Sequence, residues 1–149
     1  MTARGATLLD VNVLVALFDP DHVHHQLAHD WFAETRASGW ATCAVTEIGF
    51  VRVVSQPAYQ SPVSRAAHLV PLLRRFCSSP DHHFWAETPS ILNGKLVNPA
   101  LIQGARQLTD VYLLALAVRR RGRLATFDRT IPVGAVRGAT RDTLLVVSE

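Results

Sequence analysis

Four carboxylates stand out in the sequence because each lies where a short apolar segment gives way to a helical pattern or a turn. They are Asp10, Glu47, Asp110 and Asp128, four of the twelve acidic residues in a chain of 149. Two carboxylates about 5 Å apart repel by roughly 3 kcal/mol at an effective dielectric constant near 20. A protein offsets that repulsion by raising a pKa, by adding arginine or by binding a cation. These residues therefore predict a cation site if the fold brings them together.

The chemistry of such a site follows from its donor atoms. Hard oxygen ligands without nearby histidine or cysteine favour Mg²⁺ or Mn²⁺ over zinc, and an open acidic site suits phosphodiester hydrolysis. Each acid also has a structural alternative. Asp110 and Glu47 each follow a threonine and could favour a helix N-terminus, while Asp128 could form a turn. Asp10 is the hardest to explain in this way, because it interrupts an apolar strand.

Short apolar segments alternate with helical patterns along the whole chain. Strands are predicted over residues 7–11, 40–44, 83–86, 124–127 and 143–147. Helices are predicted over 13–18, 24–38, 46–54, 64–78 and 111–118, with a further helix starting near Pro99. Asn12 and Thr109 are the expected caps of the first and last of these, and Pro71 should kink or split the helix over 64–78. This alternation predicts one α/β domain over 1–149, a parallel sheet with helices on both faces.

That architecture places functional residues at the carboxyl ends of the strands. Neighbouring strands lie about 5 Å apart, so Asp10 and Asp128 can meet if the first and fourth strands are adjacent. Glu47 and Asp110 are expected to approach the same edge from the starts of their helices.

Composition narrows the class of protein. Hydrophobic residues make up 48% of the chain and charged residues 18%, which excludes a disordered chain. No apolar run approaches the roughly 20 residues of a membrane span, and Asp10 and Asn12 interrupt the only segment that resembles a signal peptide. We expect a soluble, cytoplasmic protein without a membrane partner. Cys43 and Cys77 form no C-x-x-C pair and are expected to be reduced core thiols.

The net charge of +3 is carried almost wholly by arginine, since Lys95 is the sole lysine. Arginine suits phosphate, although a GC-rich genome would produce the same bias, so the charge permits nucleic-acid binding without requiring it. Arg52 and Arg106 lie near acidic segments and are candidates for substrate contact. The histidines at 22, 24 and 25 fit a solvated helix start, with RNA contact or metal binding as alternatives, and the arginines within 119–123 fit a helix end or a phosphate-binding surface.

Four segments together resemble the acidic blocks of PIN-domain ribonucleases, and more narrowly the VapC-type toxins of bacterial toxin–antitoxin pairs. They are LLDVNVLVALFD at 8–19, TEIGFVRV at 46–53, QLTDVYLLALA at 107–117 and LATFD at 124–128, in the family's order and spanning nearly the whole chain. The sequence departs from close relatives at Ile48, where they often have asparagine.

The resemblance implies a five-stranded parallel α/β/α sandwich, a homodimer, metal-dependent RNA cleavage, and silencing by a cognate antitoxin that often inserts an arginine into the acidic pocket. By the same resemblance Asp10 and Asp128 would be direct ligands of Mg²⁺ or Mn²⁺, and Asp110 would be a third ligand or hold a metal-bound water. Glu47 would orient the attacking water or a second metal. Asn12 and Thr126 would not contact the metal but would fix the rotamers of the carboxylates or the positions of bound waters.

Other functions fit the residues less well. The segment DVNVL faintly resembles the D-x-D motif of haloacid-dehalogenase-type phosphatases, but Asn12 replaces the second acid. A receiver domain fails for want of a lysine after a late strand. A non-catalytic module that binds RNA or a protein partner on the same fold is the alternative from another class. The four acids favour the enzyme, because a silent relative has no reason to keep mutually repelling carboxylates.

Overall fold

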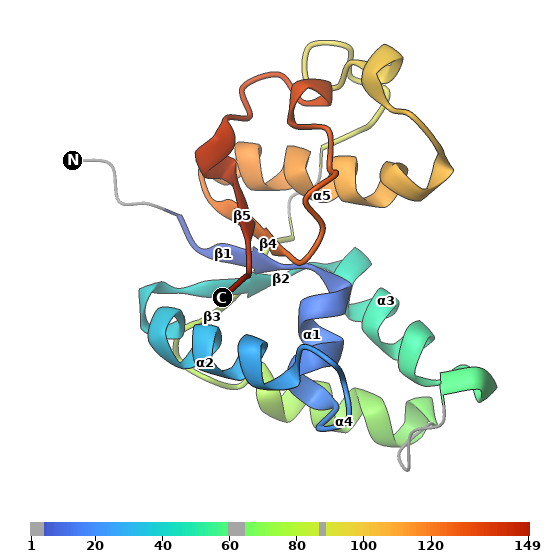
Figure 1. The fold of residues 1–149 in the computed structure, drawn as a ribbon, viewed down its shortest axis with the longest axis vertical. Coiled ribbons are helices and arrows are strands. Elements are labelled where there is room, and N and C mark those ends of the chain that lie inside the picture. Colours follow the sequence, from blue (N-terminus) through green and yellow to red (C-terminus); the bar gives the residue numbers. More distant parts are fainter. Residues whose placement is uncertain (1–4, 60–64, 87–88) are drawn as a thin grey trace.

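The computed structural model describes residues 5–59, 65–86 and 89–149 and has one five-stranded sheet at its centre (Figure 1). The strands are β1 (Thr7–Leu9), β2 (Trp40–Thr42), β3 (His82–Phe84), β4 (Arg123–Thr126) and β5 (Leu144–Val146). They are arranged in the order β3-β2-β1-β4-β5, and every neighbouring pair is parallel. The predicted five-stranded parallel sheet is therefore confirmed, with a third strand that begins one residue earlier than expected.

Helices cover both faces of the sheet, which gives the predicted α/β/α layers. The helices are α1 (Val11–Phe18), α2 (His25–Thr35), α3 (Ala44–Val54), α4 (Ala66–Phe76) and α5 (Leu108–Arg119). Figure 1 shows α1, α2 and α4 on one side of the sheet and α5 on the other. Adjacent strand residues serve the two layers: Leu9 packs with the α1–α4 layer and Leu8 with the α5 layer. None of the described helices is long and apolar enough to cross a membrane.

The starts of α1 and α5 differ from the sequence prediction. Asp10, in an extended conformation at the end of β1, caps α1 by accepting a hydrogen bond from the backbone N–H of Val11 at 2.7 Å. Asn12 already lies inside the helix, so it is not the cap. Helix α5 begins at Leu108, one residue before Thr109, because the 3₁₀ turn Ala105–Gln107 runs directly into it. The predicted caps were therefore wrong at both helices.

Two predictions concern prolines. Pro71 lies inside α4 and does not split it into two helices. The carbonyl of Ala67, which proline deprives of its helical donor, lies on an exposed residue where water can satisfy it. Near Pro99 the chain forms only the 3₁₀ turn Pro99–Leu101 in place of the expected helix.

The turn between α5 and β4 depends on Gly122. The left-handed residue there is Arg121, with a φ of 54°. Gly122 is needed for a different reason: a Cβ at this position would lie 2.2 Å from the carbonyl oxygen of Ala6 and 2.8 Å from the ring of Trp85. The first of these neighbours is backbone and cannot rotate away.

We therefore expect Gly122→Ala to lower the free energy of unfolding by about 2–3 kcal/mol, the upper range for overpacking. The matched control is Gly94→Ala, where a Cβ meets no atom within 4 Å. Urea unfolding should separate the two variants. Equal midpoints for both would show that the turn relaxes freely around the added methyl group.

Candidate metal centre

Three aspartates gather at the carboxyl edge of the central strands. Strands β1 and β4 are neighbours, with Leu9 opposite Ala125, so the next residues, Asp10 and Thr126, also lie side by side. The Thr126 hydroxyl donates to Asp10 Oδ2 at 2.9 Å, and the backbone N–H of Asp128 donates to the Thr126 oxygen at 3.1 Å. One buried hydroxyl thus connects the first and last acidic segments across 116 residues of sequence.

Asp10 is the deepest of the three aspartates, with 6% of its surface exposed. Burial raises the pKa of its carboxyl, the hydrogen bonds from Thr126 and Val11 lower it, and the charge of Asp128 raises it again. The net direction is upward. Asp10 is therefore held in a position where its negative charge is not fully compensated by protein groups.

Asp110 and Asp128 complete the group from α5 and from the turn after β4. Asp110 lies in the first turn of α5, and burial, followed by the charges of Asp10 and Asp128, raises its pKa to about 7. Asp128 is exposed at the rim, and its Oδ1 accepts hydrogen bonds from the backbone and hydroxyl of Thr130 at 2.7 and 2.6 Å. The mutual pKa effects indicate that the three carboxylates lie close enough to repel one another.

No basic side chain neutralises this group among the residues that the structure describes. Within the described residues, the ion pair joins Arg36 to Asp81. It lies near β2 and β3, away from the aspartates at β1 and β4. Three carboxylates that repel one another, with only hydroxyl and backbone donors around them, form a hard oxygen donor set. Such a set fits a divalent cation of the Mg²⁺ or Mn²⁺ type.

The raised pKa of Asp110 predicts the pH dependence of stability in the metal-free protein. Because the folded-state pKa lies above the unfolded value, the folded state binds more protons, and stability falls as the pH rises from about 4 to about 7. The full shift would correspond to about 4 kcal/mol, which partial exposure of Asp110 reduces to about 1–2 kcal/mol. Unfolding in EDTA should therefore show Asp110→Asn to be more stable than wild type at pH 8 by this amount. A variant no more stable than wild type at pH 8 would contradict the electrostatic picture.

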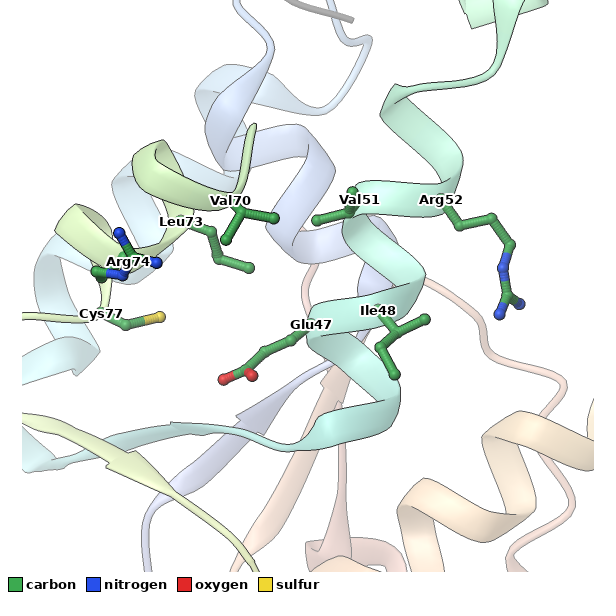
Figure 2. A pocket seen from close by; sticks show the side chains of 8 residues that line it. All are labelled: Glu47, Ile48, Val51, Arg52, Val70, Leu73, Arg74 and Cys77. Carbon is green, nitrogen blue, oxygen red and sulfur yellow. The ribbon is translucent and has the colours of Figure 1, made fainter. Parts of the chain in front are cut away.

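Glu47 does not join the aspartates in the structure. It lies in the first turn of α3, as expected, but its Oε2 accepts a hydrogen bond from the hydroxyl of Thr42 at 2.7 Å. The same hydroxyl lies 2.8 Å from His82 Nε2. Figure 2 shows the Glu47 carboxylate directed across a pocket toward Cys77. All four acids therefore lie at the carboxyl edge of the sheet, as expected, but only the three aspartates influence one another's pKa, because the Glu47 side chain turns to Thr42.

The sequence contains one weak indication that the Glu47 side chain turns toward β2. Thr42 ends β2 and its side chain lies on the same face of the sheet as Trp40, so a hydroxyl faces the helix that carries Glu47. Cys77 is a free thiol, as expected, but it is half-buried beside Glu47 and lines the pocket instead of lying in the core, whereas Cys43 is free and fully buried as predicted.

The remaining candidate residues surround these two groups at the surface. Asn12, Arg52 and Arg106 are all exposed. In Figure 2 the Arg52 side chain points away from Glu47. Arg106 lies in the turn just before α5. Among the described residues, no hydrogen bond joins the Asn12 amide to the aspartates.

The histidine segment has a structural role at the start of α2. His25 Nδ1 lies 2.7 Å from the carbonyl of Ala16, and His29 Nε2 lies 3.0 Å from that of Leu17, which ties α2 to α1. The ring of His24 lies 4.6 Å from that of Phe127, next to Asp128. In the described part of the chain, none of these rings belongs to a group able to hold a metal ion.

Comparison with known proteins agrees with this architecture. The family model described as the PIN domain matches residues 7–135. Ribonuclease VapC44 of Mycobacterium tuberculosis is 50% identical over 137 residues, which cover 92% of this chain and 96% of that protein. Ribonuclease VapC38 of the same organism is 42% identical over 121 residues (81% and 84% of the two chains), and Ribonuclease VapC39 is 38% identical over 131 residues (88% and 94%).

The family match over residues 7–135 spans all four acidic segments, and together with these relatives it confirms the resemblance seen in the sequence. The relatives are matched over most of their own length, so the likeness extends beyond a shared motif. The chain belongs to the PIN domain family and, within it, to the group whose members are named VapC ribonucleases.

Proposed function

We propose that this protein is a metal-dependent endoribonuclease and the toxin of a toxin–antitoxin pair. The observation that carries the proposal is the convergence of Asp10, Asp110 and Asp128 without a basic partner among the described residues. The names of the relatives, all ribonucleases of the VapC type, supply the reaction class. Hydrolysis of RNA phosphodiesters is the chemistry that an open site of hard carboxylate ligands serves best.

In this proposal the chain's own residues hold and align the reactants. Asp10, Asp110 and Asp128 hold Mg²⁺ or Mn²⁺, and Thr126 fixes the Asp10 carboxylate and the Asp128 backbone. When bound, the cation polarises the phosphate and stabilises the charge that develops on its oxygens.

Four further residues would act around the metal ligands. Glu47 orients the attacking water from the neighbouring helix, which requires its side chain to leave Thr42. Asn12 supports the carboxylates from the first turn of α1. Arg52 and Arg106 contact the phosphates of the substrate, since both are exposed near acidic segments.

The proposed partners follow from the same family. They are an RNA substrate, a cognate antitoxin that silences the site, and a second copy of the chain in a homodimer, all in the cytoplasm. The antitoxin is expected to place a positive side chain against the three aspartates, because their uncompensated charge attracts a cation of either kind.

The experiment is cleavage of total RNA by purified protein in Mg²⁺ or Mn²⁺. Cleavage that stops with EDTA and returns with added Mg²⁺ is the expected result. Binding of RNA without cleavage in either metal would favour a non-catalytic RNA-binding module on the same fold. Cleavage that persists in EDTA would contradict the metal-dependent mechanism.

A further inference from the structure

A second group of possible metal ligands is distinct from the three aspartates and has a different chemistry. Glu47, Cys77 and His82 each offer one ligand atom, and these three atoms lie within 4.8 Å of one another. They come from three separate elements: the first turn of α3, the end of α4 and the start of β3. Cys77 and His82 are five residues apart, whereas Glu47 precedes Cys77 by 30 residues, so it is the fold that brings the oxygen donor to the sulfur and nitrogen donors.

The hydroxyl of Thr42 organises this group. It donates its single proton to Glu47 Oε2 at 2.7 Å, so His82 Nε2, at 2.8 Å, must donate to the Thr42 oxygen. Thr42 thus holds the carboxylate and the imidazole of this group toward one point and can remain a hydrogen-bond partner of Glu47 when a cation binds.

A cation can reach this group from solvent. Glu47 and Cys77 line a pocket of about 580 Å³ between α3 and α4, and Figure 2 shows their side chains pointing toward each other across it. Arg74 also lines the pocket, yet in the described residues it forms no ion pair with Glu47. The Glu47 carboxylate is therefore available to a cation.

The chemistry of the donors selects the ion. Thiolate and imidazole ligands favour Zn²⁺, whereas Mg²⁺ prefers oxygen alone. Three protein ligands with an open fourth position are the common arrangement of an accessible zinc site. Burial, followed by the charge of Glu47, raises the pKa of the Cys77 thiol to about 11. Without a metal this cysteine is therefore a protonated thiol and a poor nucleophile.

We propose that Glu47, Cys77 and His82 form an inhibitory Zn²⁺ site. On binding, the Cys77 thiol releases its proton to solvent and the His82 proton moves from Nε2 to Nδ1, so that the thiolate, the unprotonated Nε2 and the Glu47 carboxylate coordinate the ion. The inhibitory part rests on the proposed nuclease function, in which Glu47 must turn toward the aspartates. A bound Zn²⁺ keeps the carboxylate on the α4 side and so withdraws it from the reaction.

The binding test uses Co²⁺ as a spectroscopic substitute for Zn²⁺, with excess Mg²⁺ present to occupy the aspartates. We expect one equivalent of Co²⁺ to give the thiolate charge-transfer band, to be displaced by Zn²⁺, and to bind Cys77→Ser and His82→Gln at least about 100-fold more weakly. His83→Gln, which changes an exposed neighbour, is the matched control and should bind like wild type. Wild-type affinity in both Cys77→Ser and His82→Gln would overturn the site.

The inhibition test compares RNA cleavage with and without Zn²⁺ at constant excess Mg²⁺. Zn²⁺ should lower cleavage at least tenfold in wild type and in His83→Gln, and less than twofold in Cys77→Ser and His82→Gln. Cobalt binding at Cys77 without any Zn²⁺ inhibition would overturn the link to Glu47. A protein that cleaves no RNA in any metal would refute the proposed nuclease function, while the cobalt spectrum would still decide whether the site binds metal.

Discussion

Asp10→Asn is expected to lower metal-dependent RNA cleavage by about 10³-fold while the protein stays folded. Asp10 supplies the most deeply buried carboxylate of the three. Losing it removes several kcal/mol of metal-mediated stabilisation of the transition state, and each 1.4 kcal/mol corresponds to a factor of ten in rate. The measurement is the initial rate of cleavage of a defined RNA in Mn²⁺.

The fold should survive this change for a local reason. The asparagine oxygen can still accept the hydrogen bond from Val11 that caps α1, and the variant removes a buried charge whose pKa is already raised. Circular dichroism and thermal unfolding should therefore match wild type or show a gain in stability. Asp30→Asn, at an exposed position on α2, is the matched control and should keep full activity. Near wild-type activity in Asp10→Asn would remove Asp10 from the site.

Thr126→Val is expected to lower cleavage by about 10- to 100-fold, although Thr126 would not touch the substrate. Valine has nearly the same shape but lacks the hydroxyl that donates to Asp10 and accepts from the backbone of Asp128. Groups that orient metal ligands typically contribute this much to affinity or activity. The unpaired Asp128 N–H adds about 1–3 kcal/mol of destabilisation if it stays shielded from water.

A positioning role is separated from simple packing by two readouts. The Mn²⁺ concentration for half-maximal activity should rise in Thr126→Val, since the Asp10 carboxylate loses its fixed orientation. Thr126→Ser keeps the hydroxyl and should restore both the rate and the metal dependence. Equal loss in the serine and valine variants would mean that the methyl group, and not the hydroxyl, is what the site requires.

The arrangement of the sheet and the position of Asp10 were largely predictable from sequence. Short apolar segments that alternate with helical patterns located all five strands, and an aspartate that interrupts an apolar strand already indicated function. The sequence predicted that Asp10 and Asp128 meet only if the first and fourth strands are neighbours. It could not predict that they are, because strand order depends on how the layers pack. The structure meets the condition, and Asp10 and Asp128 are joined through Thr126.

The details that sequence could not supply concern local hydrogen bonds and side-chain direction. Asn12 and Thr109 are good capping residues, but neither caps its helix. Asp10 caps α1, and the 3₁₀ turn Ala105–Gln107 leads directly into α5. Glu47 sits where the family pattern places it, yet its side chain turns toward Thr42. Cys77 was expected in the core because it lies in an apolar segment, whereas the end of α4 leaves it at the wall of a pocket.

The most direct measurement is an anomalous difference map from crystals of this protein soaked in Mn²⁺. A shared metal centre predicts a peak between the carboxylates of Asp10, Asp110 and Asp128 that is absent from crystals of the Asp10→Asn variant. A map with no peak among these three residues, from a protein that nevertheless cleaves RNA in Mn²⁺, would contradict it.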